Sequence, residues 1–206
     1  MGHKIICINR TCGSGGHSIG QAVAKELGIA YYDKNLIQEA IKFGGLENEP
    51  GFSAKKDERT HNRAFFKTHN SVGNRNVTTE GSTNDIIFQL QRDLLIEKSK
   101  EEDFVIVGRC GDRILDPETL DIKTLRCFVY APDDFRVARI MKEDGQNRAR
   151  AAMTIRRTDA RRSDYYFHYT KTSWDDRDHY QMLLNSKELG IDLCIRLLVS
   201  YYRNVL

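Results

Sequence analysis

A short glycine-rich segment, Thr11 to Ser18 (TCGSGGHS), carries the residue types that bind phosphate. Small residues let successive backbone N–H groups converge on phosphate oxygens, and the hydroxyl group of Ser18 can reach a Mg²⁺ ion. The segment corresponds to the GxxxxGK[ST] phosphate loop, in which a lysine pairs with the outer phosphates. His17 stands where that lysine is expected. A free imidazole is mostly neutral at pH 7, so the loop lacks a permanent positive charge.

The elements on either side of this loop favour phosphate binding over a simple flexible turn. Residues Lys4 to Ile8 (KIICI) form the apolar, β-branched run of a strand that is buried on both faces of a parallel sheet. From Ser18 the apolar residues recur at helical spacing until Gly28, which ends the predicted helix. A loop between strand and helix also receives the positive end of the helix dipole. The predicted ATP contacts in the loop are Gly13, Ser14, Gly15, Gly16, His17 and Ser18, and Ser18 is also the predicted Mg²⁺ ligand.

The rest of the chain alternates between strand and helix patterns. We therefore predict a P-loop NTPase fold of the α/β class, with a parallel sheet in a three-layer α/β/α arrangement. Residues 45–83 are polar and interrupt the alternation, which indicates a small inserted segment within a single domain of residues 1–206. The further predicted elements are strands at Ile29–Tyr32, Phe104–Val107 and Arg126–Tyr130, and helices at Leu36–Phe43, from an Asn84-Asp85 cap to about Lys98, from Pro132, and from Lys187 to Tyr202.

Arginines follow the loop at places where they can meet further phosphates. Arg109 comes after Gly108 at the carboxyl end of a predicted strand, the edge where open α/β sheets bind ligands. Its guanidinium can grip a phosphate in a fork, although a surface ion pair is the alternative. An arginine-rich stretch then indicates a helical lid within residues 145–180, because phosphoryl transfer depends on charge stabilisation. The arginines of this stretch are Arg148, Arg150, Arg156, Arg157, Arg161 and Arg162.

Composition excludes several other classes of protein. The net charge is only +3, from 32 Lys and Arg against 29 Asp and Glu, which is too small an excess for a surface that coats a nucleic acid polymer. The five cysteines are widely spaced and form no CxxC pair, as expected of reduced thiols. The sequence shows neither a signal peptide nor a membrane span, so we expect a cytoplasmic protein.

Four segments, in this order, resemble the cytidylate kinase-like family: IICINRTCGSGGHSIGQAVAKELGIAYYDKNLI, VIVGRCGDRIL, FVYAPDDFRVARI, and RRTDARR through to LLNS. The resemblance implies a kinase that transfers the γ-phosphate of ATP, with Mg²⁺, to a nucleoside monophosphate, CMP or dCMP. It places acceptor recognition in the inserted segment. The implied catalytic residues are His17, Arg109, Arg156 and Arg162; Arg157 joins the ATP contacts; and the implied acceptor contacts are Asp33, Arg109, Arg136, Asp159, Arg162 and Asn185.

Several of these implied roles have plainer alternatives in the sequence. Asp33 can instead cap a helix, Arg136 can lie on a solvated helix face, and Asp159 can form an i to i+3 ion pair with Arg162. The aromatic residues Tyr165, Tyr166, Tyr169, Trp174 and Tyr180 match the family, and we expect them to pack in the core or the lid.

Four positions depart from the family pattern. Besides His17, Gln181 stands where the family has an acid, Cys110 stands where true cytidylate kinases have an acid after Gly-Arg, and Glu39 aligns with an acceptor-site arginine. The departures leave two alternatives to a cytidylate kinase. One is a nucleotide-binding protein that lacks catalysis and acts as a sensor or assembly partner. The other is a kinase for a different small acceptor.

Overall fold

The computed structural model describes residues 2–49, 52 and 82–206. At its centre lies a five-stranded sheet in the order β2-β3-β1-β4-β5, and every neighbouring pair of strands is parallel. The predicted α/β fold with a parallel sheet is therefore confirmed. The strands are β1 (His3–Arg10), β2 (Ala30–Tyr32), β3 (Phe104–Val107), β4 (Ile122–Tyr130) and β5 (Met182–Asn185).

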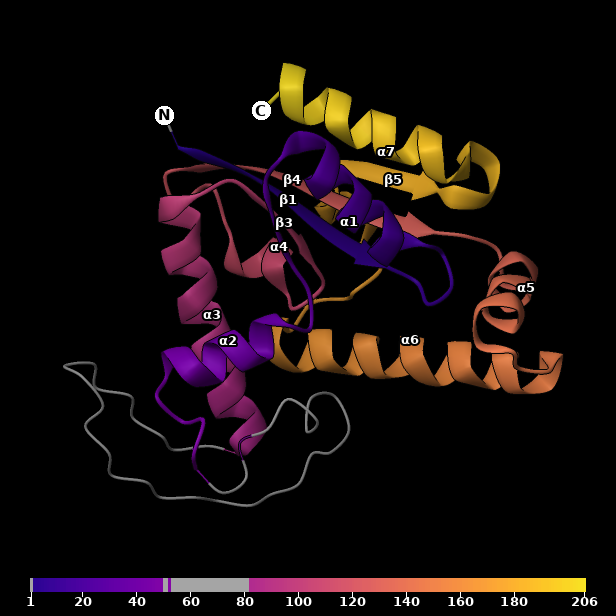
Figure 1. The fold of residues 1–206 in the computed structure, drawn as a ribbon, viewed down its shortest axis with the longest axis horizontal. Coiled ribbons are helices and arrows are strands. Elements are labelled where there is room, and N and C mark those ends of the chain that lie inside the picture. The colour runs from indigo at the N-terminus through magenta and orange to yellow at the C-terminus, as the bar shows by residue number, and fades with distance from the viewer. Residues whose placement is uncertain (1, 50–51, 53–81) are drawn as a thin grey trace.

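Helices cover both faces of the sheet and complete the three layers (Figure 1). On one face, α1 (Gly16–Leu27) and α7 (Ser186–Asn204) pack side chains such as Ile19 and Cys194 against the strands. On the other face, α2 (Leu36–Phe43) and α3 (Thr83–Glu101) pack around Leu95 and Phe104. The short helix α4 (Gly111–Ile114) follows β3. None of the helices in the described ranges has the length and apolar character needed to span a lipid bilayer.

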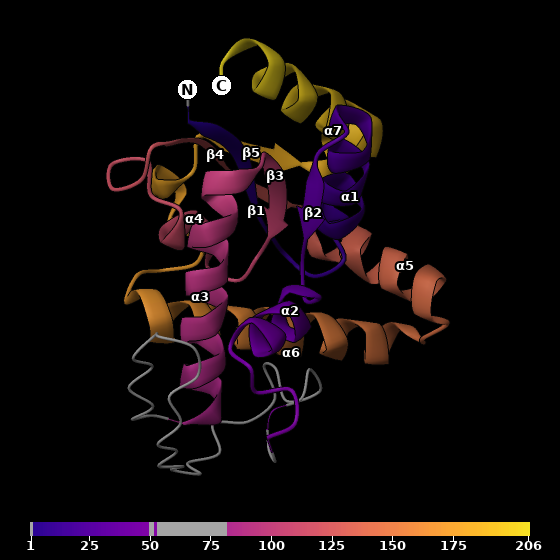
Figure 2. The ribbon, with the colours of Figure 1, turned by 60° about the vertical axis from the view of Figure 1, so that its left-hand side comes forward.

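Two helices from the second half of the chain lie at the carboxyl edge of the sheet. After β4, α5 (Asp133–Asp144) leads into the long helix α6 (Arg148–Thr170), which runs across the carboxyl ends of the strands (Figures 1 and 2). A 3-10 turn at Arg177–His179 then leads into β5. The predicted lid at 145–180 contains α6, whereas most of the predicted insertion at 45–83 lies outside the described residues.

The main differences from the predicted elements are the starts of α3 and β4 and the additional strand β5. The cap of α3 is Ser82, whose hydroxyl accepts from the backbone N–H of Asp85, while the Asp85 carboxylate accepts from the backbone N–H of Ser82. Asp85 therefore completes a capping box at the third helical position, and the predicted Asn84-Asp85 cap is wrong. β4 begins at Ile122, whereas the predicted strand begins at Arg126. The predicted start is late because the exposed Lys123 interrupts the apolar run that identifies the strand. β5 is too short for its pattern to stand out from the helix that follows.

Asp103, just before β3, joins both ends of the chain to the sheet. Its carboxylate accepts hydrogen bonds from the backbone N–H of Lys4, at 3.0 Å, and from the hydroxyl group of Tyr202. The Nδ1 atom of His3 lies 2.8 Å from the same carboxylate. Burial alone would raise the pKa of Asp103, but these hydrogen bonds outweigh burial and hold the pKa below its usual range.

We predict that Asp103→Asn lowers the free energy of unfolding at pH 7 by about 1–3 kcal/mol, the usual contribution of hydrogen bonds to a charged group. The folded-state pKa is depressed, so this contribution is present above the unfolded-state pKa and is lost as pH falls through the folded-state pKa. Urea unfolding at pH 7, 4 and 3 should show the gap between variant and wild type closing toward pH 3. Asp93→Asn, at a half-exposed helix position, is the control and should have little effect.

Candidate active site

The backbone of the phosphate loop is fixed by its own residues. It joins the end of β1 to the start of α1 through Gly13 and Gly15, whose φ angles of 77° and 87° favour glycine. The fully buried Ser14 donates its hydroxyl group to the carbonyl of Thr11 at 2.8 Å, and its own carbonyl accepts from the hydroxyl group of Ser186 at 2.6 Å. The backbone N–H of Ser14 also donates to the carbonyl of Thr11, at 3.3 Å. Both the side chain and the backbone of Ser14 therefore hold the loop in shape.

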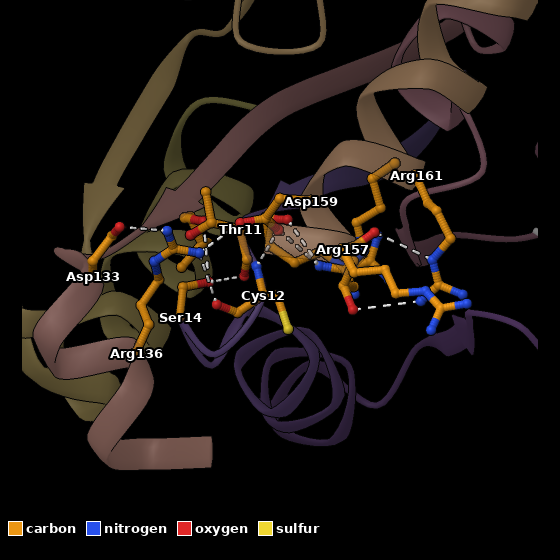
Figure 3. Close-up of polar contacts among 12 residues, drawn as sticks. Thr11, Cys12, Ser14, Asp133, Arg136, Arg157, Asp159 and Arg161 are labelled. Atoms are coloured by element: carbon orange, nitrogen blue, oxygen red, sulfur yellow. Dashed lines mark hydrogen bonds and ion pairs between the residues drawn. The ribbon is translucent and has the colours of Figure 1, made fainter. Parts of the chain in front are cut away.

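Helices α5 and α6 are attached to the same loop by one arginine and one carboxylate (Figure 3). The Oδ1 atom of Asp159 accepts from the backbone N–H of Cys12 at 2.7 Å, and its Oδ2 atom accepts from Nη1 of Arg136 at 2.5 Å. Arg136 also donates to the carbonyl of Cys12 and to Asp133, at 3.1 and 2.6 Å. Burial alone would lower the pKa of Arg136, but Asp133 and Asp159 raise it. Two of the six predicted acceptor contacts, Arg136 and Asp159, are thus engaged within the protein in this structure.

His17 points away from the loop toward the end of β2. Its Nδ1 atom lies 2.8 Å from Oδ2 of Asp33 and 3.0 Å from the hydroxyl oxygen of Tyr31. The Oδ1 atom of Asp33 lies 3.7 Å from Nη2 of Arg10, so one buried carboxylate joins the loop histidine to an arginine of β1. Asp33 is not the cap of α2, because that position belongs to Asn35.

Beside the loop, a pocket lies between the ends of β1 and β3 on one side and α6 on the other. Arg109 and Cys110 follow β3 with φ angles of 63° and 55°, a left-handed pair that turns the chain at the pocket's edge. Three guanidinium groups and three aromatic side chains contribute to its lining. The lining residues are Asn9, Arg10, Gly108, Arg109, Cys110, Arg162, Tyr165, Tyr166 and Trp174.

Among the lid arginines, Arg162 reaches this site. Its Nη1 atom donates to the backbone carbonyl of Arg10 at 3.2 Å. The same atom lies 3.9 Å from Oδ1 of Asp159, so the i to i+3 ion pair that was the alternative to a ligand role is also formed. The buried Nε–H of Arg162 has no hydrogen-bond partner within the described residues, which leaves a donor for a bound anion. Arg156 and Arg157 are exposed, and their catalytic and ATP-binding roles stay predictions.

The aromatic side chains that line the pocket form its aromatic wall, and the buried carboxylate of Asp112 holds this wall in place. The hydroxyl group of Tyr166 donates to Oδ2 of Asp112 at 2.7 Å, and Nε2 of His179 lies 2.9 Å from the same oxygen. Trp174 and Tyr166 belong to a buried cluster with Phe88, so the expected packing role is confirmed. Tyr166 and Trp174 also line the pocket. The sequence pattern did not indicate this second role.

The remaining predicted site residues lie apart from the pocket lining. Asn185 caps α7 by accepting from the backbone N–H of Lys187 at 3.2 Å. Ser18 is exposed in the first turn of α1. Cys110, by contrast, lines the pocket. Burial, reinforced by Asp112, raises the pKa of its thiol, so Cys110 stays neutral and does not replace the missing acid.

Arg10 is the site residue that the sequence analysis missed most clearly. It ends β1, at the carboxyl edge where parallel sheets bind ligands, and the rule that identifies Arg109 applies equally to it. The position of the Arg10 side chain also explains why residue 108 is a glycine. A Cβ atom at Gly108 would lie 2.2 Å from Nη1 of Arg10, and the φ angle of Gly108 is +77°.

We predict that Gly108→Ala lowers the free energy of unfolding by about 1–3 kcal/mol, because backbone strain is added to a displacement of the flexible Arg10 guanidinium. Gly28→Ala is the matched control, since Gly28 has a φ angle of +68° and open space around it, and should cost only about 1–2 kcal/mol. Urea unfolding of Gly108→Ala in an Arg10→Ala background should recover part of the loss. Equal losses for both glycines, with no recovery, would contradict a collision.

Comparisons with known proteins place this site in a family. Residues 5–188 match the cytidylate kinase-like family. A search of curated proteins found no match. An uncharacterized protein from Eubacterium ventriosum is similar in structure over 98% of this chain and 99% of its own, with 22% identity and a TM-score of 0.72. The protein TT1252 from Thermus thermophilus, 17% identical, is similar over 100% of both chains with a TM-score of 0.54. The phosphate loop, the Gly-Arg turn and the arginine-bearing helix stand together in a chain that belongs to the cytidylate kinase-like family.

Proposed function

We propose that this protein transfers the γ-phosphoryl group of ATP to a small phosphate-bearing acceptor, with CMP or dCMP favoured by the family. Membership of the cytidylate kinase-like family supports a phosphotransferase of the P-loop kinase type. The observation that carries the proposal is the pocket lined by Arg10, Arg109 and Arg162 beside the phosphate loop. Three guanidinium groups around one space fit an anionic ligand.

The arrangement gives the two substrates separate places. The N-terminus of α1 has no acidic residue in its first turn, so its backbone N–H groups and Ser18 are suited to the phosphates of ATP. The pocket on the far side of Arg10 receives the acceptor, with Tyr165 and Trp174 as planar surfaces for a base or another ring. Arg162 joins the two places through its bond to the carbonyl of Arg10.

Mg²⁺ fits this site only with help from the nucleotide. Within the described residues, no group of three or more His, Cys, Asp or Glu side chains can hold a metal ion. Mg²⁺ commonly binds through one or two protein ligands together with phosphate oxygens and water. The Ser18 hydroxyl group would supply a protein ligand, and the Asp33 carboxylate would orient a metal-bound water. The metal would then neutralise charge on the phosphates.

The test is ADP release measured with a panel of nucleoside monophosphates and other small phosphorylated or hydroxylated acceptors. We expect turnover with at least one member, highest for CMP or dCMP. Arg109→Gln should raise the KM of that acceptor about 10- to 100-fold, the range expected for lost hydrogen bonds to a charged group. Arg92→Gln, on the exposed side of α3, is the matched control and should behave as wild type.

The absence of turnover with every acceptor would refute the proposed transfer. A second candidate function, nucleotide binding without catalysis, is favoured by the neutral Cys110 and by His17 in place of lysine. It predicts that calorimetry detects tight ATP binding without ADP release, and that His17→Lys brings no gain. Increased turnover in His17→Lys would instead identify a working kinase with a weakened loop.

A further inference from the structure

The site lacks the lysine charge of the phosphate loop, and the structure shows that His17 is poorly placed to replace it. Its side chain is 54% exposed and its Nδ1 atom faces Asp33 and Tyr31. An exposed imidazole next to a carboxylate contributes little net positive potential at the loop. A fixed cation must come from elsewhere if the site is to stabilise a transferred phosphoryl group.

Arg10 is built into the space between the phosphate loop and the acceptor pocket. A Cβ atom placed at Gly16, the first residue of α1, would lie 2.5 Å from Cβ of Arg10. At the other end of the side chain, a Cβ atom at Gly108 would lie 2.2 Å from Nη1. The stem of Arg10 therefore packs on the loop while its guanidinium packs on the turn that presents Arg109. Two glycines leave room for this one side chain.

The position of Arg10 at the pocket suits it to bind an anionic ligand. Its Nη2 atom lies 3.7 Å from Oδ1 of Asp33, which orients the guanidinium at the end of β1. The other oxygen of Asp33 faces His17. Arg10 also lines the pocket, with a side chain that is 13% exposed. A partly desolvated guanidinium at a pocket wall interacts strongly with an anion.

We propose that Arg10 is the catalytic cation that replaces the lysine of the phosphate loop, binding the γ-phosphoryl group between donor and acceptor. This inference rests on the proposed function. As the γ-phosphorus leaves the β-phosphate oxygen, that oxygen keeps the bonding electron pair in ADP. A bond then forms from the acceptor oxygen to phosphorus, and a phosphate dianion as acceptor has no proton to lose. Arg10 forms no covalent bond and stabilises the charge on the transferred group.

The test compares Arg10→Gln and Arg10→Lys with the control Arg92→Gln in the full chain. Calorimetry with inorganic tripolyphosphate measures binding, and ADP release with the best acceptor measures turnover. We expect Arg10→Gln to weaken tripolyphosphate binding at least about tenfold and to lower kcat about 100-fold or more. Arg10→Lys should restore most of the binding but little of kcat, because lysine keeps the charge and loses the fork. Thermal unfolding of each variant checks that it is folded.

The two arms separate this inference from the proposed function. Wild type that binds tripolyphosphate without any turnover would refute the transfer reaction, and the binding arm alone would then decide the role of Arg10. Arg10→Gln with binding within about twofold and kcat within about threefold of wild type would overturn the inference. If Arg10→Gln does not fold, Arg10→Lys decides, and wild-type kcat in that variant would overturn the inference. Failure of wild type to bind tripolyphosphate would overturn both.

Discussion

The parallel pairing of β1 with β3 is the constraint on which the site depends. Ile8 lies opposite Val107, and the backbone N–H of Gly108 donates to the carbonyl of Ile8 at 2.9 Å. This register brings the segments that follow the two strands to the same edge of the sheet, so that Arg10 and Arg109 meet at one pocket. Successive side chains of a strand point to opposite faces, so a slip by one residue would separate them.

Two carboxylates hold positively charged side chains in place at the carboxyl edge of the sheet before any ligand binds. Asp159 and Asp33 each use both carboxylate oxygens, the first on Cys12 and Arg136 and the second on His17 and Arg10. Each carboxylate joins the phosphate loop to a second element, α5 in one case and the end of β1 in the other. The ion pairs therefore fix relative positions, which is the best-attested use of buried charge in proteins.

Much of the fold was predictable from the sequence because it rests on local patterns. Apolar β-branched runs identified β1 and β3, and helical spacing up to Gly28 identified α1. The capping box of α3 was missed because several polar residues precede that helix and only the backbone conformation selects Ser82. β5 was missed because its four residues are too few to show the alternating pattern of a strand.

The site was predictable only where a motif marks it. The loop and Arg109 follow from position in a strand-loop-helix pattern, and both line or adjoin the pocket. The engagement of Asp159 by Cys12 and Arg136 was not accessible, since it joins residues that are distant in sequence. Tyr165 and Trp174 were expected only to pack, because an aromatic residue that lines a pocket has the same sequence pattern as one in a core.

The pocket is assembled from two parts of the structure. Its guanidinium groups at Arg10 and Arg109 come from strand ends, whose positions the sheet dictates. Its aromatic wall comes from α6 and from the segment at Trp174, which Asp112 secures through Tyr166. The two sources are also connected, because Cys110, the neighbour of Arg109, packs in one buried cluster with Tyr166 and Trp174. A substitution at Asp112 would therefore reach both halves of the pocket, through the Tyr166 hydroxyl group on one side and the turn after β3 on the other.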